Sequence, residues 1–228
     1  MNTLLLDLFG TIIPCPTRKG HRNMIESMAD LADLEPDPFE NLWIHTYSER
    51  IRGVGGTSKG FIEHILRRSK MDIDEATLTE MASVWDNYTR SLFRFFPDVK
   101  PALKELKGRG IKIGLLTNCG ANVPLIFSSS DIAPIFDSFT YSSTSGFVKP
   151  QKDFYFKALE DIGSRFSETV FLGDGDNGEL PGARKVGILP VKIDRGVEKG
   201  DYRIIDEEPW DPTITTLNEI GRFFSPLS

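Results

Sequence analysis

The sequence has few cysteines, no long apolar run and no excess of basic charge. Its two cysteines, Cys15 and Cys119, are too few for a disulfide framework and do not have the spacing of a metal site. Because oxidising compartments favour disulfide-rich chains, two lone thiols favour a cytoplasmic location. No apolar stretch approaches the roughly 20 residues that span a bilayer. The first residues, Met1-Asn2-Thr3, lack the basic start of a signal peptide. We therefore expect a cytoplasmic protein without a membrane partner.

The balance of charge is acidic. The 228 residues include 27 Lys and Arg against 33 Asp and Glu, which gives a formal net charge of -6. Non-specific nucleic-acid binding depends on Lys and Arg that neutralise phosphates, so this balance predicts no nucleic-acid partner. A small anionic substrate is still compatible with it, because a bound cation inverts the local field. The length is sufficient to bury a sizeable core.

The pattern of apolar residues divides the chain into two parts. From about residue 17 to residue 96, apolar residues recur at helical spacing and no convincing strand interrupts them. Proline, glycine and aspartate breakers divide this segment into about four helices. The breakers lie at 36–38, 53–56 and 71–74, and Thr57 follows the second of them as an expected N-cap.

From about residue 111, short apolar runs alternate with helical patterns, which is typical of βα units and a parallel sheet. The run from Leu4 to Leu6 joins this sheet, because a single strand ahead of a helical bundle has no other partner. The predicted strands are 4–6, 111–116, 138–141, 169–172 and 188–193, and the predicted helices of this part are 97–109, 154–162 and 213–223.

These patterns predict an α/β fold with an inserted helical domain. We expect a doubly wound, Rossmann-like parallel sheet core built from residues 1–14 and 97–228. Residues 15–96 are expected to form an all-helical cap domain, inserted after the first strand.

Asp7 lies at the carboxyl end of the first predicted strand, directly before Leu8-Phe9-Gly10-Thr11. An ionised carboxylate at the edge of a buried strand loses hydration at a cost on the order of several kcal/mol, unless a cation or strong donors meet it. Open α/β sheets bind their ligands outside the carboxyl ends of the strands. The position therefore predicts a nucleophile or a metal ligand.

Further polar groups follow the other predicted elements. Thr117-Asn118 ends the second strand, Lys149-Pro150 precedes a helix, and Asp174 follows the strand 169–172. Together with the segment around Asp7, these motifs resemble, in order, those of the haloacid dehalogenase (HAD) superfamily of hydrolases and phosphotransferases. The resemblance extends to the subgroup with a helical cap after the first motif and covers nearly the whole chain. Its motifs are Asp7-Leu8-Phe9-Gly10-Thr11, Leu115-Leu116-Thr117-Asn118, Lys149-Pro150 and the run from Gly173 to Ala183.

The acidic residues of these motifs suit covalent hydrolysis with a metal. Asp7 as nucleophile would form a covalent aspartyl intermediate. Asp174 and Glu179 would repel Asp7 unless a divalent cation joined them, and Mg²⁺ suits an all-oxygen site shared with a substrate phosphate. The resemblance adds the backbone carbonyl of Phe9 as a further ligand. We predict Mg²⁺ as cofactor, and we expect Asp176 to face solvent because the family spacing selects Asp174 and Glu179.

The remaining motif residues suit an anionic substrate. The Thr117 hydroxyl and the Asn118 amide can hold phosphoryl oxygens, and Lys149 can balance the nucleophile and the transferring group. We therefore predict Asp7, Lys149 and Thr117 as catalytic residues, and Thr117, Asn118 and Lys149 as substrate-binding residues. The predicted partner is a small phosphorylated metabolite. Read singly, Asp7 could cap a turn, Thr117-Asn118 could be an ordinary turn and Lys149 a surface charge.

Phe9 departs from the pattern of the superfamily's phosphatases. Those enzymes normally carry at this position an Asp that protonates the leaving group and then activates water. Phenylalanine does neither, and loss of a general acid–base typically costs about 10² to 10⁴ in rate. An acid supplied by the cap is an alternative, for which Glu26, His45 and Glu49 are candidates.

Three functions stay open at this point. The favoured one is a Mg²⁺-dependent hydrolase of phosphate esters, because a metal site has no obvious use without an anionic group. The second is a 2-haloacid dehalogenase, in which the halide leaves without protonation. These enzymes carry a Tyr at this position, and Phe9 resembles it as an aromatic residue. Against it, Ile44 follows Trp43 where those enzymes carry an Arg, and Glu179 suits a cation. The third is a non-catalytic protein that binds a phosphorylated ligand or a protein partner.

Other polar residues of the helical segment carry no predicted role. His21, His45 and His64 have no metal-ligand spacing, and we expect surface or packing positions for them. Trp43, Tyr47 and Arg50 share a helix face, which more often indicates packing than recognition.

Overall fold

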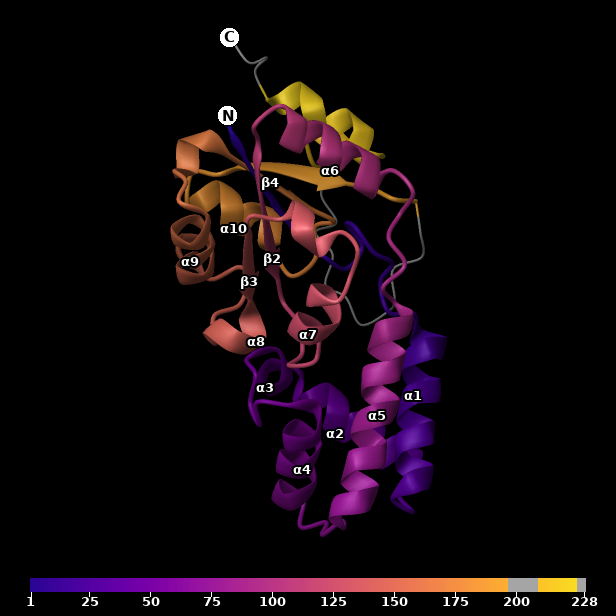
Figure 1. Ribbon diagram of the computed structural model, residues 1–228. Helices are drawn as coiled ribbons and strands as arrows, with labels where there is room; N and C mark the ends of the chain where they lie inside the picture. The colour runs from indigo at the N-terminus through magenta and orange to yellow at the C-terminus, as the bar shows by residue number, and fades with distance from the viewer. Residues whose placement is uncertain (197–208, 225–228) are drawn as a thin grey trace.

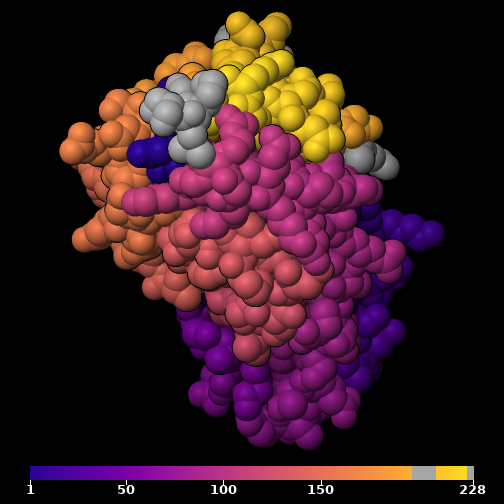
Figure 2. All heavy atoms as spheres, turned by 45° about the horizontal axis from the view of Figure 1, so that its top comes forward, coloured from indigo at the N-terminus to yellow at the C-terminus, as the bar shows by residue number. Residues whose placement is uncertain are grey.

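The structure is a computed structural model that describes residues 1–196 and 209–224. An α/β part lies at one end of the molecule and a helical segment at the other (Figure 1). In the space-filling view the α/β part is the wider mass and the helical segment the narrower one (Figure 2). Of the expected core range, residues 197–208 and 225–228 lie outside the described residues.

The α/β part is organised around a six-stranded parallel sheet with the strand order β3-β2-β1-β4-β5-β6. Its strands are β1 (Thr3–Leu6), β2 (Lys112–Thr117), β3 (Ser138–Tyr141), β4 (Thr169–Gly173), β5 (Leu189–Ile193) and β6 (Thr213–Ile214). β1 pairs with both β2 and β4, so the strand order reverses at β1 and β4. The predicted doubly wound α/β fold is confirmed, and the reversal is where such sheets form a ligand crevice.

Helices cover both faces of this sheet, because successive strand residues point to opposite sides. Leu4 and Leu6 belong to the apolar cluster beneath α6 (Val99–Gly108), whereas Leu5 belongs to the cluster beneath α9 (Lys152–Ile162) and α10 (Glu179–Lys185). Figure 1 shows α9 and α10 on one side of the strands and α6 on the other. All three leucines are fully buried, and each contributes about 1.5–3 kcal/mol by burial.

The helical segment has a hydrophobic core of its own. Its helices in the described residues are α1 (Arg18–Leu31), α2 (Pro36–His45), α3 (Tyr47–Ile51), α4 (Ser58–Arg68) and α5 (Glu75–Ser91). Trp43 packs edge-on against Trp85 and Phe61, with ring centroids 4.9 and 5.6 Å away. The predicted cap at Thr57 is confirmed, because its side chain accepts a hydrogen bond from the Gly60 N–H. One helix more than expected is present because α2 ends at His45 and α3 begins at Tyr47.

The helical segment is docked on the carboxyl end of the sheet by hydrogen bonds. α3 lies against α8 (Ser142–Ser145), where the Ser142 hydroxyl donates to the Ile51 carbonyl at 2.6 Å. Beside it, Arg52 Nη1 donates to the Gly146 carbonyl at 2.6 Å. Gly53 has a φ of +78°, and a Cβ there would lie 1.9 Å from the Ser143 carbonyl oxygen. Only glycine therefore permits this close approach.

A second contact joins α5 to the loop after β2. The Asn122 side-chain amide donates to Asp86 at 3.1 Å and to the Thr89 hydroxyl at 3.0 Å. Because α3 and α5 are both anchored in this way, the helical segment covers the strand ends that carry the predicted site residues.

The C-terminal part differs from the prediction of one helix over 213–223. Thr213–Ile214 instead forms β6 beside β5, and Leu217–Phe223 forms the 3₁₀ helix η3, which Thr216 caps. Short apolar runs suit either a strand or a helix, so their spacing could not separate the two. Glu179 is the first residue of α10. Short connecting elements that were not predicted are α7 (Val123–Ser128), η1 (Ala133–Ile135), α8 and η2 (Phe166–Glu168).

Among the described residues, no helix combines the length and the apolar character that crossing a membrane requires.

Candidate active site

Asp7 directly follows β1 and continues its pairing, because its N–H donates to the Leu172 carbonyl of β4 at 2.9 Å. Its carboxylate is 4% exposed and accepts from the Thr11 hydroxyl at 3.4 Å. The chain then turns sharply at Gly10, which has a φ of +79°. A Cβ at Gly10 would lie 2.2 Å from Asp174 Oδ2, so this turn requires glycine to bring the two carboxylates together.

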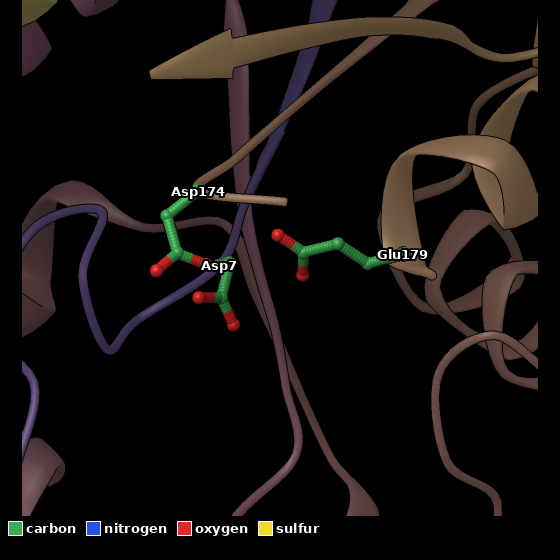
Figure 3. A group of neighbouring side chains, drawn as sticks. All are labelled: Asp7, Asp174 and Glu179. Atoms are coloured by element: carbon green, nitrogen blue, oxygen red, sulfur yellow. The ribbon is translucent and has the colours of Figure 1, made fainter. Parts of the chain in front are cut away.

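Three carboxylates converge at the point where the strand order reverses. Asp7 comes from the end of β1, Asp174 from the end of β4 and Glu179 from the start of α10, and their side chains point toward one another (Figure 3). One oxygen from each lies within 4.8 Å of the others, and all three residues are buried. The predicted assembly of these three residues is therefore present in the structure.

Lys149 bridges two of these carboxylates. Its Nζ donates to Asp7 Oδ1 and to Glu179 Oε2, each at 2.5 Å. Burial alone would lower the pKa of Lys149, but the charges of Asp7 and Glu179 outweigh it and raise this pKa above its usual range. Lys149 is therefore a buried ammonium that orients the Asp7 carboxylate, not a surface charge.

The charge of the cluster leaves room for a divalent cation. Burial raises the pKa of Glu179, and the neighbouring charges of Asp7 and Asp174 add to this effect against the opposing effect of Lys149. A divalent cation would favour the ionised form of all three carboxylates, which together carry two negative charges more than Lys149 neutralises. Oxygen ligands in this number suit Mg²⁺, which binds through few carboxylates and keeps several waters. The donor set therefore fits the predicted ion.

Neighbouring donors fix the carboxylates in place. The Gly175 N–H donates to Glu179 at 3.0 Å, and the Asp176 N–H donates to Asp174 at 3.3 Å. The Tyr155 hydroxyl donates to the Glu179 carbonyl at 2.7 Å, at the start of α10. Sequence reasoning did not single out Tyr155, because its position in α9 has an ordinary apolar pattern.

Thr117 and Asn118 occupy the end of β2, as predicted. The Asn118 side chain accepts from the Lys149 N–H at 2.9 Å and donates to the Lys149 carbonyl at 3.3 Å, so it holds the backbone of Lys149 in place. Thr117 is fully buried, with its hydroxyl 3.5 Å from the Asn118 carbonyl. Substrate contacts by Thr117 and Asn118, and a metal contact by the Phe9 carbonyl, stay predictions.

A cavity of about 350 Å³ connects the carboxylate cluster with the helical segment. This volume is at the low end of the range for ligand pockets, so it suits a small molecule. Its lining from the α/β part includes Asp7, Phe9, Asn118, Lys149, Asp176 and Glu179, and its lining from the helical segment includes His21, Trp43, Tyr47, Arg50, Trp85 and Tyr88.

Asp176 corrects the expectation of a solvent-facing side chain. It is 8% exposed and lines the cavity. The loop folds back around it, because Gly175 and Asn177 on either side both have positive φ values.

The three acids suggested from the helical segment are also corrected. Glu26 accepts from Arg22 at 2.7 Å, the exposed His45 contacts the Asn41 carbonyl, and Glu49 bonds His64 at 2.8 Å. None of these acids lines the cavity, whereas His21 and Arg50 do. Helical spacing identifies the faces of a helix but does not say which of them meets the sheet.

Comparisons with known proteins agree with this architecture. The family model for haloacid dehalogenase-like hydrolases matches residues 1–187. The glyceraldehyde 3-phosphate phosphatase of Methanocaldococcus jannaschii is 28% identical over 88% of this chain and 86% of its own length. The ribulose-1,5-bisphosphate 5-phosphatase of Halopiger xanaduensis is 25% identical over 95% of this chain and 96% of its own.

Solved structures show the same fold. A HAD phosphatase from Thermococcus onnurineus superposes with a TM-score of 0.64 and 20% identity, over 98% of this chain and 97% of its own. A 2-haloacid dehalogenase from Pseudomonas syringae pv. Tomato superposes with a TM-score of 0.67 and 20% identity, over 97% of both chains. At this identity the likeness supports the fold and does not separate the two activities.

Proposed function

The chain belongs to the haloacid dehalogenase-like hydrolases and is a hydrolase of the phosphatase type, and we propose that it hydrolyses a small phosphorylated metabolite through Asp7. The observation that carries this proposal is the buried cluster of Asp7, Asp174 and Glu179 around Lys149. A phosphate ester is recognised by cations, so a carboxylate nucleophile beside a lysine and a metal-binding acid cluster suits it. Mg²⁺ would be held by the three carboxylates and by the Phe9 carbonyl.

The proposed reaction has two steps. An Asp7 oxygen attacks the phosphorus, the bond from phosphorus to the alcohol oxygen breaks, and an aspartyl phosphate forms. Water then attacks the phosphorus, which releases inorganic phosphate and restores the Asp7 carboxylate. When bound, Mg²⁺ supplies charge neutralisation for the transferring group. Lys149 keeps Asp7 oriented and balances the negative charge of the Asp7 carboxylate.

Phe9 affects both of these steps. It lines the cavity, where a carboxyl group would otherwise protonate the leaving alcohol and later activate water. The departing oxygen therefore takes its proton from solvent, and the attacking water is not deprotonated at this position. We expect good leaving groups to react faster than alkyl phosphates, and the aspartyl phosphate to be long-lived.

We propose that residues 15–96 act as a cap over a core of residues 1–14 and 97–228. Support comes from the separate apolar core of the helical segment and from a cavity that both parts line. Such a cap excludes water and contacts the substrate. A cytoplasmic location is proposed with it, in keeping with two buried free thiols, Cys15 and Cys119.

The substrate class is a small phosphate monoester. Relatives named for their activity act on glyceraldehyde 3-phosphate, ribulose 1,5-bisphosphate and phosphoserine, so the relatives differ in the organic part and share the phosphate. A cavity of about 350 Å³ is consistent with metabolites of this size.

A 2-haloacid dehalogenase is the second candidate, supported by the aromatic side chain at Phe9. The acid cluster weighs against it, because a halide displacement needs no cation beside the nucleophile. The third candidate, a non-catalytic binder of phosphorylated ligands, would use the same cavity.

One set of assays separates these functions. Phosphate release is measured from p-nitrophenyl phosphate and a panel of metabolites with Mg²⁺, and halide release from 2-chloropropionate with and without metal. We expect Mg²⁺-dependent phosphate release that Asp7→Asn abolishes. Metal-independent halide release would overturn the phosphatase proposal. Binding of Mg²⁺ and phosphate without any turnover would establish the non-catalytic alternative.

A further inference from the structure

Arg50 in α3 is a half-buried cation that lines the cavity. Its guanidinium packs over the rings of Trp43 and Tyr47, 4.5 and 5.3 Å from their centroids, and Nη1 donates to the Trp43 carbonyl at 2.8 Å. Burial lowers the pKa of Arg50 to about 10, so the group is still charged at neutral pH. In the part of the chain that the structure describes, no carboxylate lies within ion-pair distance of it.

Two other arginines of the helical segment, Arg22 and Arg67, are paired with acids. Arg22 bonds Glu26 and Glu40, and Arg67 bonds Glu63 at 2.7 Å. These arginines lie toward solvent, where an ion pair contributes little to stability. Arg50 differs from them in its partners, because its guanidinium contacts aromatic rings and the Trp43 carbonyl instead of a carboxylate. The segment therefore contains carboxylates but places none of them at Arg50.

Further polar groups lie at the same end of the cavity. The Tyr88 hydroxyl of α5 is closed to solvent and has no hydrogen-bond partner among the described residues. His21 of α1 lies close enough to Arg50 to feel its charge. Burial first and then the Arg50 charge lower the pKa of His21. Glu40 lies 3.6 Å from His21 and accepts from Arg22, so it does not neutralise Arg50. This end of the cavity therefore offers a cation and a hydroxyl donor.

The position of Arg50 relative to Asp7 is held by the docking of α3. The residues that follow it are tied to α8 through the bond from Ser142 to the Ile51 carbonyl and through the close approach at Gly53. Trp43 and Trp85 supply apolar walls to the same cavity. The cavity therefore combines the charged groups at Asp7 and Lys149, the cation Arg50 and apolar walls, which together match a small ligand with two charged groups on a carbon chain.

We propose that Arg50 binds a second anionic group of the substrate, so that the substrate is a small phosphate monoester with a carboxylate or another phosphate at its far end. The inference rests on the proposed function for the end at Asp7. A guanidinium binds either group through paired hydrogen bonds, and the Tyr88 hydroxyl adds a donor. A cavity of about 350 Å³ is consistent with a small metabolite that carries both groups.

The test uses substrates that differ only at the far end. 3-Phosphoglycerate is compared with glycerol 3-phosphate, and propane-1,3-diol bisphosphate with its monophosphate, which separates a carboxylate from a phosphate. We expect the wild-type protein to prefer one anionic member of these pairs through a lower KM. In Arg50→Met this preference falls about 10- to 100-fold, the effect of hydrogen bonds to a charged group. Arg67→Met, which removes an exposed charge of α4, keeps the preference.

A purely structural Arg50 predicts a different pattern. If its task is to hold the Trp43 carbonyl and its ring, Arg50→Met lowers the Tm and leaves the preference intact, which would overturn the proposal. The proposal expects the preference to disappear while the Tm stays level or rises, because an uncompensated charge has been removed. Arg50→Lys keeps the charge without the paired donors, and we expect an intermediate preference.

Binding measurements separate this inference from the proposed function. Calorimetry with Mg²⁺ compares 3-phosphoglycerate and glycerol 3-phosphate on the Asp7→Asn protein, with and without Arg50→Met. Binding that favours an anionic far end and depends on Arg50 supports the inference even if wild-type protein turns over neither compound. Turnover with equal KM values in both substrate pairs overturns the inference and leaves the phosphatase proposal standing.

Discussion

The carboxyl edge of the sheet and the helical segment bury cations in opposite ways. At the sheet edge, Lys149 is met by Asp7 and Glu179 at 2.5 Å, and the acids outnumber it. In the helical segment, Arg50 is met by aromatic rings and one backbone carbonyl. The first arrangement suits a metal cation and the second suits an anion. In our proposal the α/β part accordingly performs the chemistry and the helical segment selects the substrate.

Removal of the nucleophile is expected to have the largest effect. Asp7→Asn should reduce phosphate release by about 10⁴- to 10⁶-fold, the range for losing a catalytic nucleophile. Asp72→Asn, an exposed position of the helical segment, is the matched control and should leave the rate unchanged. Steady-state release from p-nitrophenyl phosphate measures both. Activity that survives in Asp7→Asn would show that another residue is the nucleophile, and it would contradict the assignment of the chemistry to the sheet edge.

Restoring an acid at Phe9 is expected to raise the rate. Phe9→Asp should increase turnover of alkyl phosphates by about 10²-fold, the low end for a general acid–base. Phe9→Asn is the control, because it loses the same packing against the sheet but has no proton to transfer. Initial rates with glycerol 3-phosphate give the comparison. Equal rates in the two variants would show that Phe9 is not what limits this site.

The docking of the helical segment is tested by a pair of glycines. Gly53→Ala places a Cβ 1.9 Å from the Ser143 carbonyl, whereas Gly56→Ala has a similar φ and nothing within 4 Å. Both variants lose about 1–2 kcal/mol of stability from the positive φ. Only Gly53→Ala should raise KM, by about tenfold or 1.4 kcal/mol, because it shifts α3, and with it Arg50, relative to the residues at the sheet edge. A similar KM in both variants would show that substrate selection does not depend on this docking contact.

Metal binding should stabilise the protein through the sheet edge alone. Mg²⁺ at about 100 times its Kd contributes about 2.7 kcal/mol. For a chain of this size that corresponds to a rise in Tm of about 5 to 10 °C. Asp174→Asn should remove most of this rise, and Asp153→Asn, on the exposed side of α9, should keep it. Thermal melts with and without Mg²⁺ provide the measurement. An equal rise in Tm in both variants would contradict the assignment of the metal site to the sheet edge.

The site residues at the sheet edge were predictable because their signals are local. The apolar run before Asp7 marks a buried strand with a carboxylate at its end, and the run from Gly173 to Glu179 repeats that arrangement on β4. Parallel strands bring such ends together without further information. The burial of Asp176 was not predictable, because it depends on how one loop folds back.

The helical segment was predictable as helices but not as a binding surface. Its spacing predicted one helix face for Trp43, Tyr47 and Arg50; Arg50 does contact both rings, but Trp43 lies in α2 and the other two residues lie in α3. Within residues 1–196 and 209–224, no carboxylate lies beside Arg50, and this depends on the tertiary structure, which sequence spacing does not reveal. The same holds for Glu26 and Glu49, whose partners turn them away from the cavity.

The most direct test of the account is a rapid-quench experiment with p-nitrophenyl phosphate and Mg²⁺. This leaving group departs without protonation, so the first step is fast, whereas Phe9 leaves the second step without a base. The account predicts a burst of about one p-nitrophenol per protein, followed by slow turnover, with phosphate on Asp7 in the acid-quenched protein. Linear release from the first turnover, with no phosphate on Asp7, would contradict it.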